Sequence, residues 1–379
     1  MSQPKNCDAL ANEARPSPRL AVESSTARTI VIDGRQYLFF GGCGYLALAH
    51  EPRVLAALSQ GAARYGVSSG AARETTGNVC DHEALEREIA AALELEDALL
   101  LPEGATANLA LGESLDSEFS SAIADAESHP TLLHAARTSG IPLSTYGDDD
   151  AALRAIAAST GDVVVWTDGV FPSAGRMAPL AKLLGALPLG RGLLVVDDCH
   201  GFGVLGKRGR GSVEAAGIFD ARVVVTGTLS KALGTYGGFV AGTRERIANV
   251  RSRSAVYAGT TPLAPPLTSA ARAALAILVG EPARLATYRS LVSAFRSRLA
   301  LLRVPMKDME FPVCAFELAP AARMRQVHEA CLREGVFLPL IRYAGAGPDG
   351  FFRIVWNAAH TPADLERLVV VLGRALESA

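Results

Sequence analysis

Short apolar runs alternate with helical segments between about residues 97 and 242, and this alternation constrains the fold more than any other feature. The runs are residues 98–101, 163–166, 193–196, 223–225 and 239–241. Uninterrupted apolar runs of this length are typical of strands buried on both faces, and strands separated by helices form mainly parallel sheets. We therefore predict an α/β fold with helices on both faces of a mainly parallel sheet.

The segments before and after this region have other patterns. Residues 1 to about 28 are predicted to form a loose arm, and the next twelve a hairpin with Asp33-Gly34 at its turn. A proline-rich break near 262 precedes a predicted long helix over about 266–302 and a smaller α+β region. That region is predicted to contain strands at 313–318, 336–338 and 351–356, a helix at 322–334, and a last helix capped by Thr361. We predict an arm and hairpin (1–48), a large domain (49–262) and a small C-terminal domain with its linking helix (263–379).

Composition excludes several classes of function. The chain has 379 residues with 37 Lys plus Arg and 39 Asp plus Glu, a net charge of −2, which argues against broad electrostatic binding to nucleic acid or anionic membranes. No apolar segment approaches the ~18 residues that span a membrane, and no secretory signal is visible, so we expect a cytoplasmic protein. The cysteines are scattered without a CxxC pair, which predicts reduced thiols and neither a zinc site nor a disulfide framework.

Polar residues follow two of the predicted strands. Asp197 and His200 come directly after 193–196, and Lys231 follows 223–225 across a short turn. In an open α/β sheet, ligands bind beyond the carboxyl ends of the strands. A partly desolvated lysine can form a Schiff base with a carbonyl, and a carboxylate keeps a pyridine ring protonated and therefore an electron sink. Together these residues predict a pyridoxal 5′-phosphate (PLP) site, with His200 on the ring 3′-oxygen.

A glycine-rich motif follows His200 and suggests a different cofactor. Residues 201–206 fit the pattern GxGxxG, which in nicotinamide-binding proteins opens a helix directly after a strand. Here the motif follows Asp-Asp-Cys-His in mid-chain, so a glycine-rich loop is the better interpretation. A nicotinamide-dependent oxidoreductase remains the alternative from another class, and a non-catalytic PLP-binding regulator is a further one.

Several motifs occur together in the order of a known family. They lie at residues 45–48, 65–70, 82–86, 104–108, 178–180, 196–206, 226–234 and 353–360. From about residue 29 to its end, the chain resembles the α-oxoamine synthases, which are fold-type I PLP enzymes. The resemblance implies a large domain with a mainly parallel sheet between helices and a smaller α+β C-terminal domain.

The resemblance also implies roles for individual residues. Lys231 would hold PLP and move protons at the substrate α-carbon, His129 would stack on the pyridine ring, and Arg353 would bind the substrate carboxylate. The helix that opens at Gly104, Ala105 and Thr106 fits the phosphate, with a hydroxyl from Thr228. Thr260 and Thr261 would reach the phosphate bound by the neighbouring subunit, which predicts a homodimer with shared sites.

The chain departs from the family pattern at several positions. The family's usual residue is replaced by Cys43, Ala47, Glu103, Asp168, Pro172 and Arg176. Cys43 is expected on the substrate side and Asp168 near the cofactor. Glu103 would place a carboxylate beside the phosphate, which is unfavourable unless its side chain turns away.

The resemblance implies a PLP-dependent C-acyltransferase. It would condense a small amino acid with an acyl thioester, from acyl-CoA or an acyl carrier protein, usually with decarboxylation. The departures keep another PLP reaction open as an alternative: aminotransfer, decarboxylation or aldol cleavage on the same scaffold.

Overall fold

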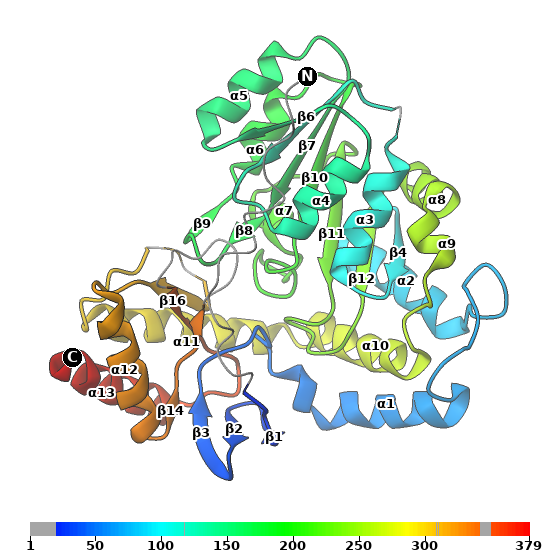
Figure 1. Cartoon of the computed structure of the whole chain (residues 1–379). Coiled ribbons are helices and arrows are strands. Elements are labelled where there is room, and N and C mark those ends of the chain that lie inside the picture. The colour runs from blue at the N-terminus through cyan, green and yellow to red at the C-terminus, as the bar shows by residue number, and fades with distance from the viewer. Residues whose placement is uncertain (1–19, 117, 308, 310, 342–349) are drawn as a thin grey trace, which may run out of the picture.

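The computed structural model describes residues 20–341 and 350–379 except 117, 308 and 310, so most of the predicted arm lies outside the described residues. A seven-stranded sheet forms the centre, in the order β4-β12-β11-β10-β7-β5-β6 (Figure 1). β12 is antiparallel to both of its neighbours, whereas the other pairs are parallel. The strands are β4 (Asp97–Leu101), β5 (Ser121–Asp125), β6 (Leu143–Tyr146), β7 (Val163–Asp168), β10 (Gly192–Asp197), β11 (Val223–Thr228) and β12 (Gly238–Gly242). The mainly parallel sheet is confirmed, and β5 and β6 are additions to the five strands predicted.

Helices cover both faces of this sheet, as predicted. Successive strand residues point to opposite faces, so Leu99 and Val164 belong to one apolar cluster while Leu100 and Val165 belong to the other. The first cluster lies under α3, α4 and α8, and the second under α2, α5 and α6. These helices are α2 (Cys80–Leu93), α3 (Gly104–Ser114), α4 (Pro130–Thr138), α5 (Asp149–Ala158), α6 (Leu180–Ala186) and α8 (Arg244–Arg253), with the short α7 (Ser212–Ala215) and α9 (Ala255–Gly259) nearby.

The predicted hairpin forms, and it joins the two ends of the chain. β2 (Thr29–Ile32) pairs with β3 (Arg35–Phe39), and Asp33 and Gly34 both have positive φ, as a two-residue hairpin turn requires. β1 (Ser24–Ser25) extends the sheet on one side, and β14 (Val336–Phe337) pairs in parallel with β3 on the other. The predicted strand at 336–338 therefore belongs to the hairpin sheet rather than to the sheet of the other C-terminal strands.

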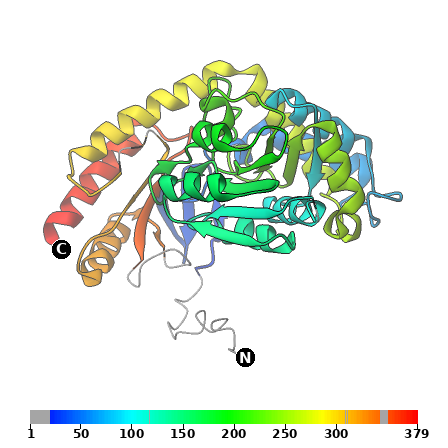
Figure 2. The ribbon, with the colours of Figure 1, turned by 90° about the horizontal axis from the view of Figure 1, so that it is seen from above.

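The single helix predicted over 266–302 is wrong. The segment forms α10 (Pro265–Gly280) and α11 (Pro282–Ala300), because Glu281 leaves the helical region and Pro282 starts a new helix. Figure 2 shows the two helices as a long arc that runs from the central sheet to the C-terminal part. α1 (Pro52–Tyr65), which follows the short 3₁₀ helix Leu48–His50, packs against α10.

A three-stranded sheet and two helices complete the C-terminal part. The strands are β13 (Val313–Phe316), β15 (Leu340–Ile341) and β16 (Phe351–Val355), and the helices are α12 (Ala321–Arg333) and α13 (Pro362–Ser378). The predicted cap of the last helix is confirmed: the Thr361 side chain accepts a hydrogen bond from the backbone of Asp364, whose carboxylate accepts one from the Thr361 backbone.

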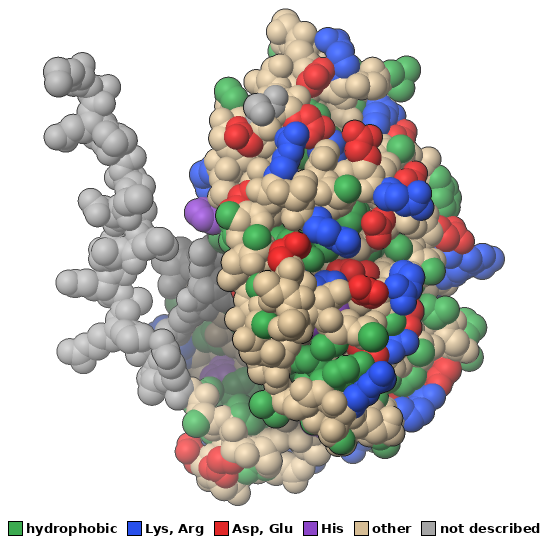
Figure 3. Space-filling model, turned by 90° about the vertical axis from the view of Figure 1, so that its right-hand side faces the viewer, with side chains coloured by type: hydrophobic (Ala, Val, Ile, Leu, Met, Phe, Trp, Pro, Cys, Tyr) green, Lys and Arg blue, Asp and Glu red, His purple; other side chains and the backbone are tan. Residues whose placement is uncertain are grey.

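The surface agrees with the near-neutral charge. On the face shown in Figure 3, basic and acidic side chains of the described residues are interspersed. Among the described residues, no helix combines the length and apolarity needed to cross a membrane. The five cysteines described are all free thiols.

Candidate active site

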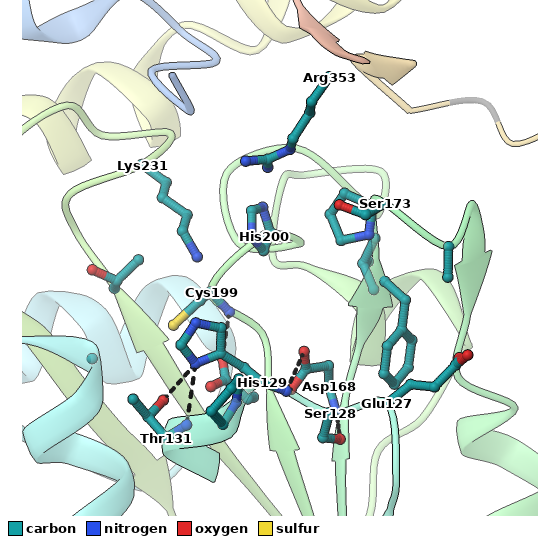
Figure 4. Close-up of a pocket in the computed structure, with 18 of the residues that line it drawn as sticks. Glu127, Ser128, His129, Thr131, Asp168, Ser173, Cys199, His200, Lys231 and Arg353 are labelled. Carbon is teal, nitrogen blue, oxygen red and sulfur yellow. Dashed lines mark hydrogen bonds between the residues drawn. The ribbon is translucent and has the colours of Figure 1, made fainter. Parts of the chain in front are cut away.

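A cavity of about 910 Å³ opens at the carboxyl ends of the central strands, where the C-terminal part faces the sheet. Five side chains predicted to act together line it, and Figure 4 shows most of them converging on the same space. They are Lys231, Asp197, His200, His129 and Arg353. Gly104, Ala105, Asp168 and Thr228 also line this cavity, whereas Thr106, Cys43, Thr260 and Thr261 are not part of its wall.

Asp197 is held rigidly at the end of β10. Its carboxylate is buried, with Oδ2 accepting a hydrogen bond from Asn108 Nδ2 (2.7 Å) and Oδ1 accepting one from the Cys199 backbone (3.0 Å). Asn108 Oδ1 in turn accepts from the Thr226 hydroxyl (2.6 Å), which fixes the amide so that its NH₂ faces Asp197. Sequence reasoning missed this role of Asn108, although the residue lies within a quoted motif.

Asp168 ends the adjacent parallel strand β7, opposite Asp197 in register. Burial and the neighbouring Asp197 raise the pKa of Asp168 well above its ordinary value, as expected of a buried carboxyl beside another one. Its carboxylate accepts the backbone N–H of His129 (3.2 Å), and its own N–H donates to Ser128 Oγ (3.1 Å). Asp168 therefore holds the loop that carries His129.

His129 caps α4 and presents its ring to the cavity (Figure 4). Its Nδ1 contacts the Thr131 hydroxyl (2.7 Å) and accepts from the Thr131 backbone (3.3 Å). Burial lowers the pKa of His129, although the negative charge of Asp197 partly opposes this. A neutral, oriented imidazole suits the predicted role of a flat cover on the cofactor ring.

His200 is paired with a buried tyrosine. Its Nδ1 lies 2.7 Å from the hydroxyl of Tyr45, a residue that the sequence analysis did not place in the site. Burial, and then the positive charges of Lys231 and Arg353, lower the pKa of His200 well below its ordinary value. Burial likewise raises the pKa of Tyr45 well above its own, so both partners are neutral at neutral pH.

Lys231 follows the end of β11 in a tight turn, in which its carbonyl accepts a hydrogen bond from the Gly234 backbone (3.0 Å). Figure 4 shows its side chain extending into the cavity. Thr228, three residues earlier, donates from its hydroxyl to the carbonyl of Gly237 (3.0 Å) and lies 2.8 Å from Ser230 Oγ. The turn therefore places the amine of Lys231 and the hydroxyl-bearing residues Thr228 and Ser230 in the wall of the same cavity.

The amino end of α3 supplies the predicted phosphate position. Gly104 lies against Cys199 and Thr228, and a Cβ at this position would lie 3.1 Å from the Cys199 sulfur. The departure at Glu103 places an exposed side chain on the cavity wall, where its carboxylate accepts a hydrogen bond from the Tyr236 hydroxyl (3.4 Å). The Thr106 hydroxyl is used locally, donating to the Glu103 carbonyl (2.7 Å), so only the backbone of Thr106 remains for a phosphate.

Arg353 enters the cavity from β16, on the opposite side from the central strands (Figure 4). Its Nη2 donates to Cys43 Sγ (3.4 Å). The predicted substrate contact at Cys43 is therefore indirect in this structure, because Cys43 touches the guanidinium and not the cavity wall.

Thr260 and Thr261 lie outside the cavity of their own chain. The Thr260 hydroxyl donates to the carbonyl of Val256, and Thr261 is exposed. Their assignment to the neighbouring subunit's phosphate stays a prediction. Residues 201–206 form the turn that was predicted, and no helix begins until Ser212, which removes the structural context of a nicotinamide fingerprint.

The residues present fit PLP. An amine for the aldehyde, a fixed carboxylate for the pyridine nitrogen and a helix amino end for the phosphate surround one cavity. At the amino end of α3, Gly104 has no side chain that would crowd Cys199 and Thr228, so its backbone stays accessible to a phosphate. This fold and site define a PLP-dependent transferase of fold type I.

Comparisons with known proteins identify the family. Residues 44–372 match the aminotransferase class I and II family. The chain is 36% identical over 365 residues to the 8-amino-7-oxononanoate synthase of Thioalkalivibrio sulfidiphilus, covering 94% of this chain and 93% of the relative. Identity to the Methylococcus capsulatus protein of the same name is 36% over 366 residues, covering 94% of each.

Solved structures show the same fold. Sphingomonas wittichii serine palmitoyltransferase superposes with a TM-score of 0.88 at 22% identity, covering 95% of this chain and 92% of that one. Francisella tularensis 8-amino-7-oxononanoate synthase gives 0.76 at 23% identity, covering 90% and 98%. The chain belongs to the aminotransferase class I and II family and, within it, to the α-oxoamine synthases. It is a PLP-dependent C-acyltransferase that condenses a small amino acid with an acyl thioester.

Proposed function

We propose that this chain condenses alanine with a seven-carbon acyl thioester that ends in a free carboxylate, and releases carbon dioxide, a thiol and 8-amino-7-oxononanoate. The name of the relatives' product supports this choice, because its C8 and C9 correspond to decarboxylated alanine and its C1 to C7 to the acyl group. A bond forms between the alanine α-carbon and the acyl carbon, while the C–S bond and the bond to the carboxyl carbon break.

The observation that carries this proposal is the convergence of Lys231, Asp197, His200, His129 and Arg353 on one cavity. Bound PLP supplies an electron sink for the charge left on the α-carbon when a proton or carbon dioxide leaves. The carboxylate of Asp197, held by two hydrogen bonds, would keep the ring nitrogen protonated.

Three side chains act on the substrate and its surroundings. The amine of Lys231 takes the proton from the amino acid α-carbon and later returns one. Arg353 binds the amino acid carboxylate, a task that suits a guanidinium. The ring of His129 covers one side of the cavity and excludes water from the reacting carbon.

His200 acts as a hydrogen-bond donor toward the cofactor ring oxygen. When the Tyr45 hydroxyl donates to Nδ1 across their 2.7 Å contact, the ring proton stays on Nε2 and is available for donation. The depressed pKa of His200 keeps the ring neutral, so one tautomer is maintained through turnover.

We also propose a cytoplasmic homodimer. Thr260 and Thr261 do not line the cavity of their own chain, and Thr261 is exposed, which supports their assignment to a site in a second subunit. The acyl group would arrive on coenzyme A or on an acyl carrier protein.

The test measures free thiol release from seven-carbon acyl thioesters with and without a terminal carboxylate, in the presence of alanine, glycine or serine. Alanine with the carboxylate-ended thioester is expected to give the highest kcat/KM, with one carbon dioxide per thiol. Thiol release with another pair would replace the substrates proposed here. Pyridoxamine phosphate formation without thiol release would indicate aminotransfer and contradict the proposal.

A further inference from the structure

We infer that Arg176 is a positioning residue, which joins two segments of the cavity wall and thereby sets the position of His129. The segments are the loop 126–129, which ends at His129, and residues 171–174, which run from the end of β8 (Val170–Phe171) into the turn before β9 (Arg176–Met177). Both segments line the cavity, but Arg176 itself does not.

The guanidinium binds two carboxylates at the end of β5. Nη2 donates to both oxygens of Asp125 (2.9 Å each), and Nε donates to Glu127 Oε2 (2.8 Å). Asp125 is almost fully buried, with 3% of its side chain exposed, so this carboxylate depends on Arg176 for its counter-charge. Glu127 is 56% exposed and adds little stability by itself.

Asp125 also shapes the loop that leads to the histidine. Its Oδ1 accepts the Glu127 N–H (2.9 Å), and its carbonyl accepts the Ser128 N–H (3.1 Å). Ser128 Oγ then accepts the N–H of Asp168, and Asp168 binds the N–H of His129. Figure 4 shows Glu127, Ser128 and His129 in succession beside Asp168. The orientation of His129 therefore depends on the pair between Arg176 and Asp125.

The same guanidinium fixes the second segment. Its Cζ lies 3.5 Å from the centroid of the Phe171 ring, and Phe171 is a buried part of the cavity wall. Phe171 and Arg176 are paired in register across the β8–β9 ladder. Gly175, just before Arg176, has φ +64° and no room for a Cβ beside Lys307, so this position of the turn requires glycine.

This arrangement explains a departure from the family pattern. Where the family usually has Asp, Arg176 neutralises two acidic side chains, Asp125 and Glu127, and packs on an aromatic ring. A side chain that binds a buried carboxylate through one nitrogen and a second carboxylate through another, and also lies over an aromatic ring, has a geometry that lysine cannot reproduce fully.

The experiment compares Arg176→Gln, Arg176→Lys and Asp125→Asn with the matched control Arg246→Gln. Arg246 likewise pairs with a carboxylate, that of Glu118, and lies over a ring, Phe119, and none of these three residues lines the cavity. Each variant is measured for thermal unfolding of the apoprotein, the PLP dissociation constant, visible circular dichroism of bound PLP, kcat and KM.

Arg176→Gln and Asp125→Asn are expected to lower kcat about tenfold and to change the circular dichroism of bound PLP, since small displacements of positioned groups have large kinetic effects. Arg176→Lys should recover part of the lost kcat. The double variant, Arg176→Gln with Asp125→Asn, should have a kcat no lower than that of the slower single variant, because both changes break the same ion pair. Arg246→Gln should lower the unfolding temperature but leave kcat and the circular dichroism of bound PLP unchanged.

The inference is overturned if Arg176→Gln changes only the unfolding temperature, as the control does. If that variant does not fold, unchanged kcat and circular dichroism in Arg176→Lys and Asp125→Asn overturn it instead. The PLP measurements need no acyl substrate, so they separate a failure of this inference from a failure of the proposed reaction.

Discussion

The two ends of the cavity are built differently. At the inner end, Asp197 is buried and His200 is half-buried, each is held by a hydrogen-bond contact of 2.7 Å, and the flanking sequence follows the family pattern. At the outer end, Pro172 follows β8 and Arg176 begins β9, both residues depart from the family pattern, and the ion pair between Arg176 and Glu127 is partly exposed. The inner end is constrained by one cofactor, whereas the outer end can vary with the substrate.

The most severe way to break the inner end is Lys231→Ala. Loss of the amine removes both the covalent link to PLP and the group that moves protons, so we expect a fall in kcat of about 10⁴-fold. Borohydride should no longer fix PLP to the chain. Steady-state thiol release and mass spectrometry check this, with Lys182→Ala, an exposed position on α6, as the control. A variant that retains turnover would show that another group is the nucleophile.

Asp197→Asn tests the electrostatic part of the inner end. The amide keeps the shape but loses the charge that holds the ring nitrogen protonated, so kcat should fall about 10²- to 10³-fold. The absorbance of bound PLP should change with it. Asp220→Asn, at a partly buried ion pair with Arg222 away from the cavity, serves as the control. An unchanged rate would refute the assigned role.

Removing the Tyr45 hydroxyl tests how much the inner end depends on the hydrogen bond to His200. Tyr45→Phe deletes the partner of His200 Nδ1, and we expect kcat to fall about tenfold, the range of one lost buried hydrogen bond. Because burial holds the pKa of His200 well below its ordinary value, the wild-type kcat should show no His200 titration between pH 6 and 8. A pH–rate profile of both proteins checks this. A wild-type inflection that disappears in His200→Gln would contradict the neutral assignment.

The last prediction concerns stability and not catalysis. Asp198 is fully buried, its Oδ2 accepts the Ser212 N–H (2.7 Å), and burial raises its pKa to about 7. Between pH ~4 and 7 the folded chain keeps this proton while the unfolded chain loses it. The group therefore lowers the free energy of unfolding as pH rises, by about 1.4 kcal/mol per pH unit, and has no further effect above pH 7.

Asp198→Asn mimics the protonated form and should remove this contribution to the pH dependence. Chemical unfolding of both proteins at pH 5, 6, 7 and 8 measures the difference. Equal slopes in the two proteins would contradict the assignment of that proton to Asp198.

The fold was largely predictable from local sequence because apolar runs reveal strands buried on both faces. β5, with the sequence Ser-Ala-Ile-Ala-Asp, and β6, Leu-Ser-Thr-Tyr, escaped because small and hydroxylated residues give no such run. The reversed direction of β12 could not be predicted either, since its sequence differs little from that of a parallel strand.

The candidate site was predictable where its chemistry is carried by one side chain at a strand end, as at Asp197 and Lys231. It was not predictable where a role depends on long-range pairing. Asn108 contacts Asp197, 89 positions away, and Arg176 contacts Asp125, 51 positions away. No local pattern encodes such contacts, and Tyr45 was masked by its place in an apolar motif.

The parallel pairing of β3 with β14 has a consequence for synthesis of the chain. The partner of β3 lies about 300 residues further along, so at ~5–20 residues per second the ribosome needs about 15 to 60 seconds to make it. During that interval one edge of the nascent hairpin has no partner strand from its own chain. The hairpin sheet therefore stays incomplete until most of the last third of the polypeptide has been made and β14 can pair with β3.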